Sequence, residues 1–380
     1  MHICFITGEY PKPGYPHGGI GTFVKTLGTA LANQGHHVSI LVITRGNITE
    51  YEQEGSIIIY RIAQFRLRGM SWLINGYKLN RVIRQINLVS PIDVIEAPEA
   101  GLAFIKKLKT VRYIVRLHGG HYFFSEAEKR GINRWKAFQE RLSLKKADII
   151  VGVGHYVMQH TADYIDFKNK QGPVIYNPIN LDKFYEADPG KAVHGCIFFS
   201  GTLIEKKGIR QLINALPLIK KEISAAHLVI AGRDSKLPDG SSYVDWLKQG
   251  VSDQILESIK FLGPVANDEI PGLIEKAEVC VFPSHMETFG IAAAEAMAMA
   301  KPVVFTKLGP GPEVIRHGIT GLLCDPYNPQ DIADKVLEIL KNPNFGISLG
   351  LAARQDVAER FSITTLLKQN ILLYKSVLKN

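Results

Sequence analysis

The chain has 380 residues, of which 46% are hydrophobic and 21% charged, and its formal net charge at pH 7 is +9. This length exceeds what one hydrophobic core usually supports, so two domains are expected. The composition excludes a disordered or fibrous protein, and no apolar run approaches the roughly 18 residues of a membrane-spanning helix.

The positive charge is unevenly distributed. Residues 1–180 hold 23 Lys and Arg against 13 Asp and Glu, a balance of +10, whereas residues 181–380 hold 22 against 23. Such asymmetry can attract anionic partners, including acidic lipid surfaces, nucleic acid and phosphorylated acceptors. A solvated surface with scattered Lys and Arg explains it equally well.

The cysteines and the N-terminal residues both bear on the cellular compartment in which the protein is expected. Cys4, Cys196, Cys280 and Cys324 are far apart in sequence and lack the paired spacing of a zinc site or a disulfide framework, so buried thiols in a reducing compartment are expected. The opening MHICFIT begins a strand without a basic leader, which favours a cytoplasmic protein.

In the first half of the chain, short β-branched runs alternate with helical stretches. The predicted strands cover residues 2–7, 36–44, 56–62, 93–98, 112–119, 147–154 and 173–178. The helix after the first strand places Phe23, Leu27 and Leu31 on one face. This alternation predicts a parallel sheet covered by helices.

The same pattern restarts after a polar segment containing Pro and Gly, residues 180–195, and the hinge between the domains is expected near residues 178–194. Further strands are predicted at residues 195–202, 226–232, 258–263, 277–284, 301–306 and 321–325. The prediction is therefore an α/β protein of two doubly wound, Rossmann-like domains. The domains cover residues 1–180 and 181–361, and ligands of such sheets bind beyond the carboxyl ends of the strands, in the cleft between two facing domains.

Two strand-to-helix turns could hold a phosphate. Gly18, Gly19 and Gly21 follow the first strand and open a helix, so their backbone amides could approach a phosphate closely, although an unliganded glycine-rich turn would look similar. In the second domain, Lys206 and Lys207 of SGTLIEKKGI also follow a strand. A lysine pair at a helix start opposes the helix dipole, which favours a bound anion over a merely solvated helix start.

The segment SHMETFGIAAAEAMAMAKP carries two glutamates eight positions apart. Glu287 lies in the turn after a strand, Gly290 opens a helix, and Ala292 to Ala300 form its body. Glu295 falls about two turns into that helix, where a buried carboxylate needs partners such as the vicinal hydroxyls of a ribose. An ion pair with a neighbouring Lys or Arg is the alternative.

His118 ends the strand RYIVRLHG and is followed by two glycines. A histidine at a strand end faces the region where ligands of such sheets bind, so a functional role is favoured over a place in the core.

The combination of HGGIGTFV, RLHGG, IYNPINLDKF, SGTLIEKKG, HLVIAGRD, IKFLGPV, PSHMETFGIAAAEAMA and GPGPEVIRHGITGLLCDP resembles the GT4 family of retaining glycosyltransferases, which have the GT-B fold. The resemblance covers nearly the whole chain. It implies an acceptor-binding first domain, completed by a C-terminal helix at about residues 362–380, and a second domain that binds a nucleotide-sugar donor. The helix would carry Leu366, Leu367, Ile371, Leu372 and Tyr374 as its apolar residues.

The resemblance also implies roles for single residues. His118, Glu287 and Lys207 would be the catalytic residues, with Lys207 neutralising the pyrophosphate and His118 touching the donor sugar. Glu295 would bind the ribose hydroxyls. The remaining donor-binding residues would be Gly18, Gly19, Gly21, Thr202, Lys206, Arg233, Leu262, Val265, Phe289, Gly290 and Ile291. No cofactor or metal is expected, because the chain has no Asp-x-Asp motif and Lys207 with the helix dipoles would stabilise the leaving diphosphate.

One residue departs from the family pattern. The family usually has Gly-Arg-Leu before its Lys-Gly, whereas this chain has Gly201-Thr202-Leu203. A hydroxyl cannot replace a bidentate guanidinium charge. Either Lys206, Arg210 or Arg233 compensates, or the donor is bound differently.

The basic segment of residues 128–147 carries Ile132, Trp135, Phe138 and Leu142 near one face. This face could touch an anionic membrane that holds lipid-linked acceptors. A surface helix with its apolar face in the core is the alternative, and it is the one that the sequence favours.

These features predict an enzyme that transfers a hexose or N-acetylhexosamine from a nucleotide-diphosphate sugar, with UDP as the expected nucleotide. The acceptor would be a glycan or glycolipid in surface-polysaccharide assembly. The alternatives are a noncatalytic nucleotide-sugar-binding relative, suggested by Thr202, and a sugar-nucleotide epimerase of similar build. A nicotinamide dehydrogenase is disfavoured, because the first glycine turn lacks the G-x-G-x-x-G fingerprint, and nucleic-acid binding lacks a known module.

Overall fold

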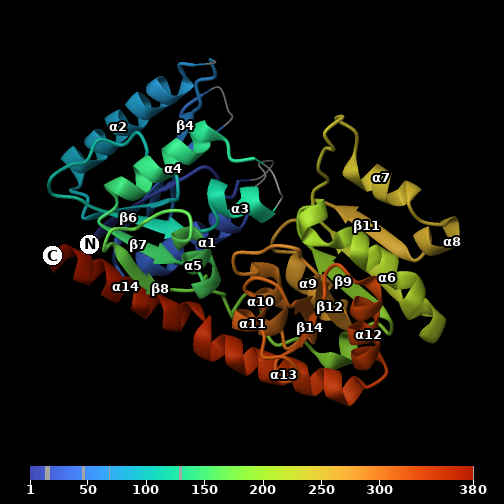
Figure 1. The fold of residues 1–380 in the computed structure, drawn as a ribbon. Coiled ribbons are helices and arrows are strands. Elements are labelled where there is room, and N and C mark those ends of the chain that lie inside the picture. The colour runs from blue at the N-terminus through green and yellow to red at the C-terminus, as the bar shows by residue number, and fades with distance from the viewer. Residues whose placement is uncertain (13–17, 45–47, 68, 128–130, 380) are drawn as a thin grey trace. The chain divides into compact units, whose positions relative to one another are not determined.

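The computed structural model describes residues 1–12, 18–44, 48–67, 69–127 and 131–379. The chain divides into two compact units (Figure 1). Unit 1 comprises Met1–Pro178 and Ile363–Asn380, and unit 2 comprises Ile179–Ser362. The sequence placed the divisions after residues 180 and 361, and the structure places them after Pro178 and Ser362.

Unit 1 is built on an eight-stranded sheet with the order β3-β4-β2-β1-β5-β6-β7-β8. Its strands are β1 (His2–Thr7), β2 (His37–Thr44), β3 (Glu50–Glu54), β4 (Ile57–Ala63), β5 (Val94–Pro98), β6 (Arg112–Leu117), β7 (Ile149–Gly152) and β8 (Gln171–Val174). All neighbours pair in parallel except β3 with β4. Every residue of β1 is buried, as expected of a parallel strand with helices on both faces of the sheet.

The helices of unit 1 are α1 (Gly19–Asn33), α2 (Ser71–Val89), α3 (His121–Ala127), α4 (Arg134–Lys146), α5 (His155–Ala162) and α14 (Ile363–Lys379). On one face of the sheet, α1 and α14 form a shared core. The predicted face of α1, Phe23, Leu27 and Leu31, is buried there with Leu366 and Tyr374 of α14. Leu372 of the same helix is 66% exposed, so it lies outside this core.

A buried polar network fastens α14 to the sheet. Arg116 of β6 is fully buried and its Nε donates to Glu96 Oε1 of β5 at 2.6 Å. Arg116 also donates to Asn370 Oδ1 of α14 at 2.6 Å, and the Tyr374 hydroxyl donates to Glu96 Oε2 at 2.8 Å. Because each buried charge has a partner of opposite sign, the desolvation cost is offset, and removing one partner would be strongly destabilising.

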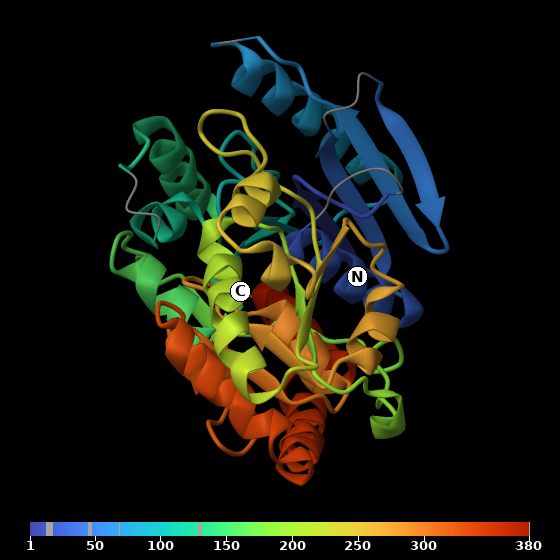
Figure 2. The ribbon, with the colours of Figure 1, turned by 90° about the vertical axis from the view of Figure 1, so that its right-hand side faces the viewer.

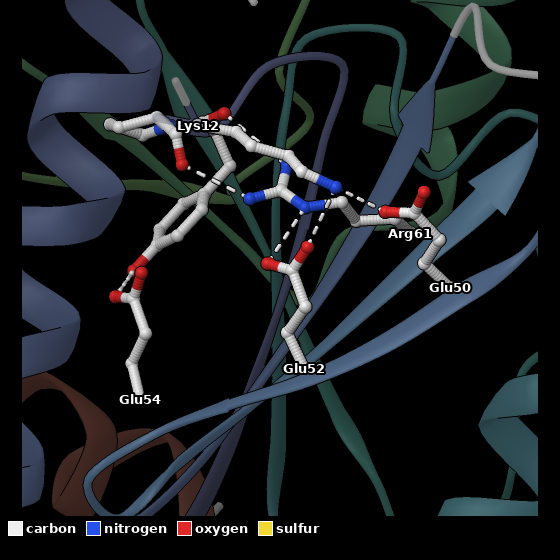
Figure 3. A network of polar contacts seen from close by, with 7 residues as sticks. Lys12, Glu50, Glu52, Glu54 and Arg61 are labelled. Atoms are coloured by element: carbon white, nitrogen blue, oxygen red, sulfur yellow. Dashed lines mark hydrogen bonds and ion pairs between the residues drawn. The ribbon is translucent and has the colours of Figure 1, made fainter.

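A second polar network ties the segment after β1 to the antiparallel edge of the sheet (Figure 3). Lys12 pairs with Glu50 and, at 2.9 Å, with Glu52. Arg61 of β4 donates to Glu52 Oε2 at 3.0 Å, and the Tyr10 hydroxyl donates to Glu54 Oε2 at 3.2 Å. Figure 2 shows the β3–β4 hairpin (blue) along this edge. The network therefore fixes the chain on the approach to the glycine-rich turn.

Unit 2 contains a six-stranded parallel sheet with the order β11-β10-β9-β12-β13-β14. Its strands are β9 (Cys196–Ser200), β10 (His227–Ala231), β11 (Ile259–Gly263), β12 (Val279–Phe282), β13 (Val303–Thr306) and β14 (Leu322–Cys324). Its helices are η1 (Pro189–Lys191), η2 (Glu205–Lys207), α6 (Ile209–Glu222), α7 (Tyr243–Gln249), α8 (Asp253–Leu256), α9 (Ile270–Lys276), α10 (Ile291–Ala298), α11 (Gly311–Val314), α12 (Pro329–Leu340) and α13 (Pro343–Arg360). All four cysteines of the protein are free and buried.

The strand orders identify one special point in each sheet. In unit 1 the chain moves from β1 to β2 on one side and later returns to β5 on the other, so β1 and β5 flank the reversal. In unit 2 the corresponding strands are β9 and β12. Ligands of doubly wound sheets bind beyond the carboxyl ends of the strands at such switch points, so these two places are where functional side chains are sought.

No helix within the described ranges is long and apolar enough to cross a membrane.

Candidate active site

Two of the predicted catalytic residues meet at the switch point of unit 2. Lys207 belongs to η2, just after β9, and Glu287 follows β12. Lys207 Nζ donates to Glu287 Oε1 at 2.5 Å, and Ser284 Oγ donates to the same oxygen at 2.9 Å. The side chains are 25% and 15% exposed, so this pair remains open to a ligand.

Close backbone contacts set the position of Lys207. Gly208 has φ of +70°, and a Cβ on this residue would lie 1.8 Å from the carbonyl oxygen of Pro283. The amide of His285 donates to the carbonyl of Lys206 at 2.9 Å. The turn after β9 thus packs directly on the turn after β12, and only glycine fits after the two lysines.

Helix α10 begins beside this pair. Gly290 has φ of +93°, and a Cβ there would lie 2.5 Å from the ring of Phe305. Phe289 is buried with its ring 5.1 Å from that of Phe361, so its side chain serves the core and Ile291 then starts the helix. The helix ends at Ala298, before the predicted Ala300, because Ala300 has φ of 55° in the left-handed region.

Glu295 lies in the second turn of α10 and is 8% exposed. Its carboxyl makes no hydrogen bond or ion pair with any part of the chain that the structure describes, and the nearby Lys183 pairs instead with Asp268 at 2.8 Å. The local ion pair considered as an alternative is therefore not formed. Burial raises the pKa of Glu295 to about 7, against the opposing effect of Lys183. A buried carboxyl without a partner is costly, so this group is poised for a ligand.

The position where the family has arginine is occupied by Thr202, in the turn between β9 and η2. Of the three cations that might compensate, Arg210 is bound elsewhere, because its Nε and a terminal nitrogen donate to Glu205 Oε1 at 3.1 and 2.6 Å. Burial raises the pKa of Glu205, but hydrogen bonds from Arg210, Tyr243 and Gln211 outweigh it and hold that pKa at about 2. Arg233 is exposed and Lys206 adjoins the site, so these two remain candidates.

Three of the predicted donor-binding residues lie at two neighbouring strand ends of unit 2. Arg233 follows β10, and Leu262 and Val265 lie at and just after the end of β11. The amide of Gly232 donates to the carbonyl of Gly263 at 2.8 Å, and a Cβ on Gly232 would lie 1.8 Å from the carbonyl oxygen of Gly201. The turns after β9, β10 and β11 are thus held together in one row, which contains Thr202.

In unit 1, the glycine-rich turn already has an acceptor. Gly18 precedes α1, and Gly19 and Gly21 lie in its first turn. Glu9 accepts from the amide of Gly18 at 2.9 Å and from that of Gly21 at 3.1 Å. Two of the amides proposed for a phosphate are therefore occupied by a carboxylate, which sequence reasoning missed. Residues 13–17, which include part of the HGGIG motif, lie outside the described residues.

His118 lies at the carboxyl end of β6, with its ring 4.8 Å from that of Phe23. Burial and the neighbouring guanidinium of Arg116 lower the pKa of His118 to about 3, so the imidazole is neutral at pH 7. A neutral imidazole can donate one hydrogen bond and accept another, which suits contact with a sugar hydroxyl.

Two buried carboxyls beneath the His118 turn were also missed. Glu99 accepts from the amide of Gly119 at 2.6 Å, and Glu140 of α4 accepts from that of Tyr122 at 3.1 Å. A Cβ on Gly120 would lie 1.7 Å from Glu140 Oε1, which has no partner among the described residues. Burial and the charge of Glu140 raise the pKa of Glu99 to about 8, and burial raises that of Glu140 to about 7. The second glycine of RLHGG, Gly120, is thus explained by the carboxyl of Glu140 below it.

Comparisons with known proteins decide the family. Residues 191–356 match the model of the group 1 glycosyl transferases, and residues 17–183 match the model of glycosyltransferase family 4. The chain belongs to glycosyltransferase family 4. An uncharacterized glycosyltransferase of Methanocaldococcus jannaschii is 29% identical over 344 residues, which are 90% of each chain.

Solved structures show the fold of this family 4 glycosyltransferase. Sucrose-phosphate synthase from Thermosynechococcus elongatus aligns over 100% of both chains with a TM-score of 0.85 and 19% identity. The Anabaena protein HepE, solved in complex with UDP-glucose, aligns over 99% of this chain and 100% of that chain, with a TM-score of 0.77 and 19% identity. The predicted GT-B fold of two Rossmann-like domains is confirmed, and so is the predicted class of enzyme, a glycosyltransferase.

Within the described part of this glycosyltransferase, no group of three or more His, Cys, Asp or Glu side chains is arranged to hold a metal ion.

Proposed function

We propose that this glycosyltransferase moves a hexose or N-acetylhexosamine from a nucleotide-diphosphate sugar, with UDP as the expected nucleotide, to a glycan or glycolipid acceptor in surface-polysaccharide biosynthesis. One observation carries the donor part of the proposal. The Lys207–Glu287 pair, the start of α10 and the unpaired carboxyl of Glu295 gather at the switch point of unit 2. This set offers a cation and helix amides to a diphosphate and a carboxyl to ribose hydroxyls.

The proposed reaction retains the anomeric configuration. The bond between the anomeric carbon and the diphosphate oxygen breaks, the acceptor oxygen forms its bond on the same face, and the acceptor proton passes to the leaving phosphate. Lys207 and the amides at the start of α10 stabilise the negative charge that develops on the leaving group. In unit 2, Glu287 holds the transferred sugar by hydrogen bonds, and in unit 1 the neutral His118 offers hydrogen bonds to a sugar hydroxyl. Because Lys207 supplies the positive charge, the transfer proceeds without a metal ion.

We also propose that unit 1 contacts an anionic membrane surface in the cytoplasm. Helices α2 and α4 and the residues just before α4 expose large apolar side chains, among them Leu73 at 54%, Tyr77 at 68%, Ile132 at 49% and Phe138 at 51%. The chain has no Asp or Glu between Glu54 and Asp93, and Glu140, the one acidic residue of α4, is buried. Exposed apolar groups among cations without anions suit the interface of an anionic bilayer.

The donor proposal is tested by calorimetric titration of UDP, GDP and ADP and their sugar conjugates without metal. One nucleotide is expected to bind the wild type and to bind Glu295→Ala at least about tenfold more weakly, because a hydrogen bond to a charged group contributes about 1.5–3 kcal/mol. Glu257→Ala, at an exposed position of unit 2, is the matched control. Equal affinity of the wild type and Glu295→Ala for the nucleotide would remove Glu295 from the site.

Two further measurements address the chemistry. Transfer in the presence of a chelator tests the independence from metal, and proton NMR of the first-formed product gives its anomeric configuration. A chelator-sensitive transfer or an inverted product would contradict the corresponding part of the proposal.

A noncatalytic nucleotide-sugar-binding protein is the second candidate, because Thr202 lacks the guanidinium charge and Arg210 is engaged by Glu205. Such a protein would bind the nucleotide sugar but show neither transfer nor donor hydrolysis. Replacing Thr202 by Arg would then be expected to create activity, whereas in an active enzyme it changes the donor affinity.

A further inference from the structure

Unit 1 contains a pocket of about 320 Å³ at its own switch point. Ile6, Thr7 and Gly8 line it from the carboxyl end of β1, and Pro98 lines it from that of β5. The rest of the lining consists of Ile43, Gln64, Ser71, Trp72, Asn75, Gly76, Leu79, Ala100, Gly101, Phe104, Ile105, Trp135 and Gln139. The pocket lies where doubly wound sheets bind ligands, and its volume is at the lower end of the usual range for small-molecule sites.

Three aromatic rings form one wall. They belong to Trp72 of α2, to Phe104 in the segment after β5, and to Trp135 of α4. The distance between ring centroids is 5.0 Å for Trp72 and Phe104, 6.0 Å for Trp72 and Trp135, and 5.9 Å for Phe104 and Trp135. Trp72 is 41% exposed and Trp135 45%. These rings come from three separate parts of the chain, and the two tryptophans among them leave part of their faces open to solvent.

The wall is held in place by α2. Asn80 of α2 donates to the carbonyl of Phe104 at 2.9 Å, and a Cβ on Gly76 of the same helix would lie 3.0 Å from Phe104 Cβ. This close approach fixes Phe104 against α2. The rings are therefore positioned before any ligand arrives, which lowers the entropic cost of binding.

The polar groups of the pocket are neutral. Among the residues that the structure describes, no charged side chain lines it. The amide of Asn75 is occupied, because it accepts from the amide of Phe65 at 2.8 Å and donates to the carbonyl of Phe65 at 3.0 Å. The side-chain amides of Gln64 and Gln139, by contrast, form no hydrogen bond within the described ranges of the chain. The pocket thus combines aromatic faces with two amides that can both donate and accept.

We propose that this pocket binds an uncharged sugar ring of the acceptor, an inference that rests on the proposed transferase function. A pyranose presents apolar C–H faces, which stack on aromatic rings, and a rim of hydroxyls, which suit the amides of Gln64 and Gln139. A phosphate or carboxylate finds no cation among the described lining residues. A lipid chain would leave the partly buried amide of Gln139 without a partner in the filled pocket, at a cost in free energy.

The chain has only three tryptophans, so the indole N–H signals in a ¹H–¹⁵N correlation spectrum report on the pocket directly. Trp72 and Trp135 line the pocket, whereas Trp246 lies on α7 in unit 2 and serves as the internal control. The probes are methyl glycosides of glucose, galactose, mannose and N-acetylglucosamine, up to about 100 mM, far above the roughly 1 mM upper end of ordinary KM values. 1-Hexanol is the apolar probe without a sugar.

At least one methyl glycoside is expected to shift the signals of Trp72 and Trp135 and to leave that of Trp246 in place. Trp135→Ala should weaken its Kd about tenfold, which corresponds to about 1.4 kcal/mol, and Trp135→Phe should restore most of the affinity. Gln139→Leu, which removes the amide at similar size, should also weaken binding. Because Trp135 and Gln139 are partly exposed on α4, these variants test binding with little effect on the core.

Three results would overturn the proposal: no shift with any glycoside, an equal shift of Trp246, or shifts with 1-hexanol alone. Titration of the nucleotides on the same samples separates this inference from the proposed function. Nucleotide binding without glycoside binding refutes the sugar pocket and leaves the transferase standing. Glycoside binding without nucleotide binding refutes the transferase proposal.

Discussion

The switch points of the two units share a topology but differ in chemistry. In unit 2, the strand ends carry the Lys207–Glu287 pair and the start of α10. In unit 1, the corresponding strand ends border a pocket whose described lining residues carry no charge and which is walled by Trp72, Phe104 and Trp135. The fold decides where a ligand binds, and the residues placed there decide whether it is an anion or a neutral ring.

Charge is also handled differently in the two places. In unit 2, Lys207 and Glu287 are partly exposed and can exchange their partner for a ligand. In unit 1, Glu99 and Glu140 are buried beneath the His118 turn and their pKa values are raised to about 8 and about 7, so neither carries a full negative charge at neutral pH. Charge is thus accessible where a diphosphate is proposed and reduced by burial beneath the His118 turn.

The largest effect is expected from breaking the charged site of unit 2. Lys207→Met should lower kcat/KM for transfer by about 10²–10³, because the cation acts on charge that develops in the transition state. The measurement is the initial rate of transfer or donor hydrolysis. Lys221→Met, at an exposed position of α6, is the matched control and should leave the rate within about twofold.

The same experiment can separate a direct role of Lys207 from mere support of Glu287. Glu287→Gln removes the ion pair but keeps the cation. If Lys207 only held Glu287, the two single variants and the double variant would lose the same activity. A larger loss in Lys207→Met than in Glu287→Gln supports contact with the leaving group.

A medium effect is expected from the buried carboxyls of unit 1. Both pKa values lie above the ordinary value of 4.5, so the folded protein binds these protons more tightly than the unfolded chain. The stability they contribute is therefore fully present below about pH 4.5 and is lost as the pH rises through about 7 and 8. At pH 9, the free energy of unfolding of Glu140→Gln should exceed that of the wild type by roughly 2 kcal/mol. At pH 5, the two proteins should have similar free energies of unfolding.

Calorimetric unfolding across this pH range gives the measurement. Glu257→Gln is the control, because that side chain is exposed and should follow the wild-type curve. Parallel curves for Glu140→Gln and the wild type would mean that Glu140 is ionised in the folded protein across this pH range. The raised pKa of Glu140 would then be wrong.

The sequence predicted the parts of this molecule that depend on local pattern. Alternating strands and helices gave both sheets, and Lys207, Glu287 and Glu295 were found because each lies in a short motif next to a strand. Glu9 could have been noticed from its place just after the first strand. Glu99 and Glu140 could not, since they are far apart in sequence and meet only when α4 packs below the turn after β6.

The tryptophan pocket illustrates the same limit. Trp135 was singled out for one face of a basic helix, with the core as its favoured destination, yet its ring stacks on Phe104 and stays 45% exposed. Trp72 carried no signal, because no pattern in α2 shows that this residue meets Trp135. A contact between side chains of distant segments depends on the packing of whole helices, which local spacing does not encode.

The smallest effect concerns the exposed apolar side chains of α2 and α4, which are proposed to contact a membrane. This prediction also distinguishes the two units, because unit 2 carries no excess of positive charge. The wild type is expected to sediment with vesicles of mixed phosphatidylglycerol and phosphatidylcholine, and less with phosphatidylcholine alone. Leu73→Ser and Phe138→Ser should each weaken this binding about threefold to tenfold, since each removes one apolar side chain from the interface. Leu73 does not line the aromatic pocket, so glycoside binding should persist in Leu73→Ser, whereas Phe138 stacks on Trp135 with ring centroids 5.7 Å apart.

Leu351→Ser is the matched control, because Leu351 is 50% exposed on α13 of unit 2. Raising the salt concentration should weaken the binding of the wild type, since cations on α2 and α4 contribute about 1 kcal/mol each near an anionic surface. Binding that is independent of the anionic lipid, or equal losses in Leu351→Ser and Leu73→Ser, would mean that this face has another partner. The aromatic pocket would then have to draw its acceptor from solution, and the acceptor would be a free glycan instead of a glycolipid.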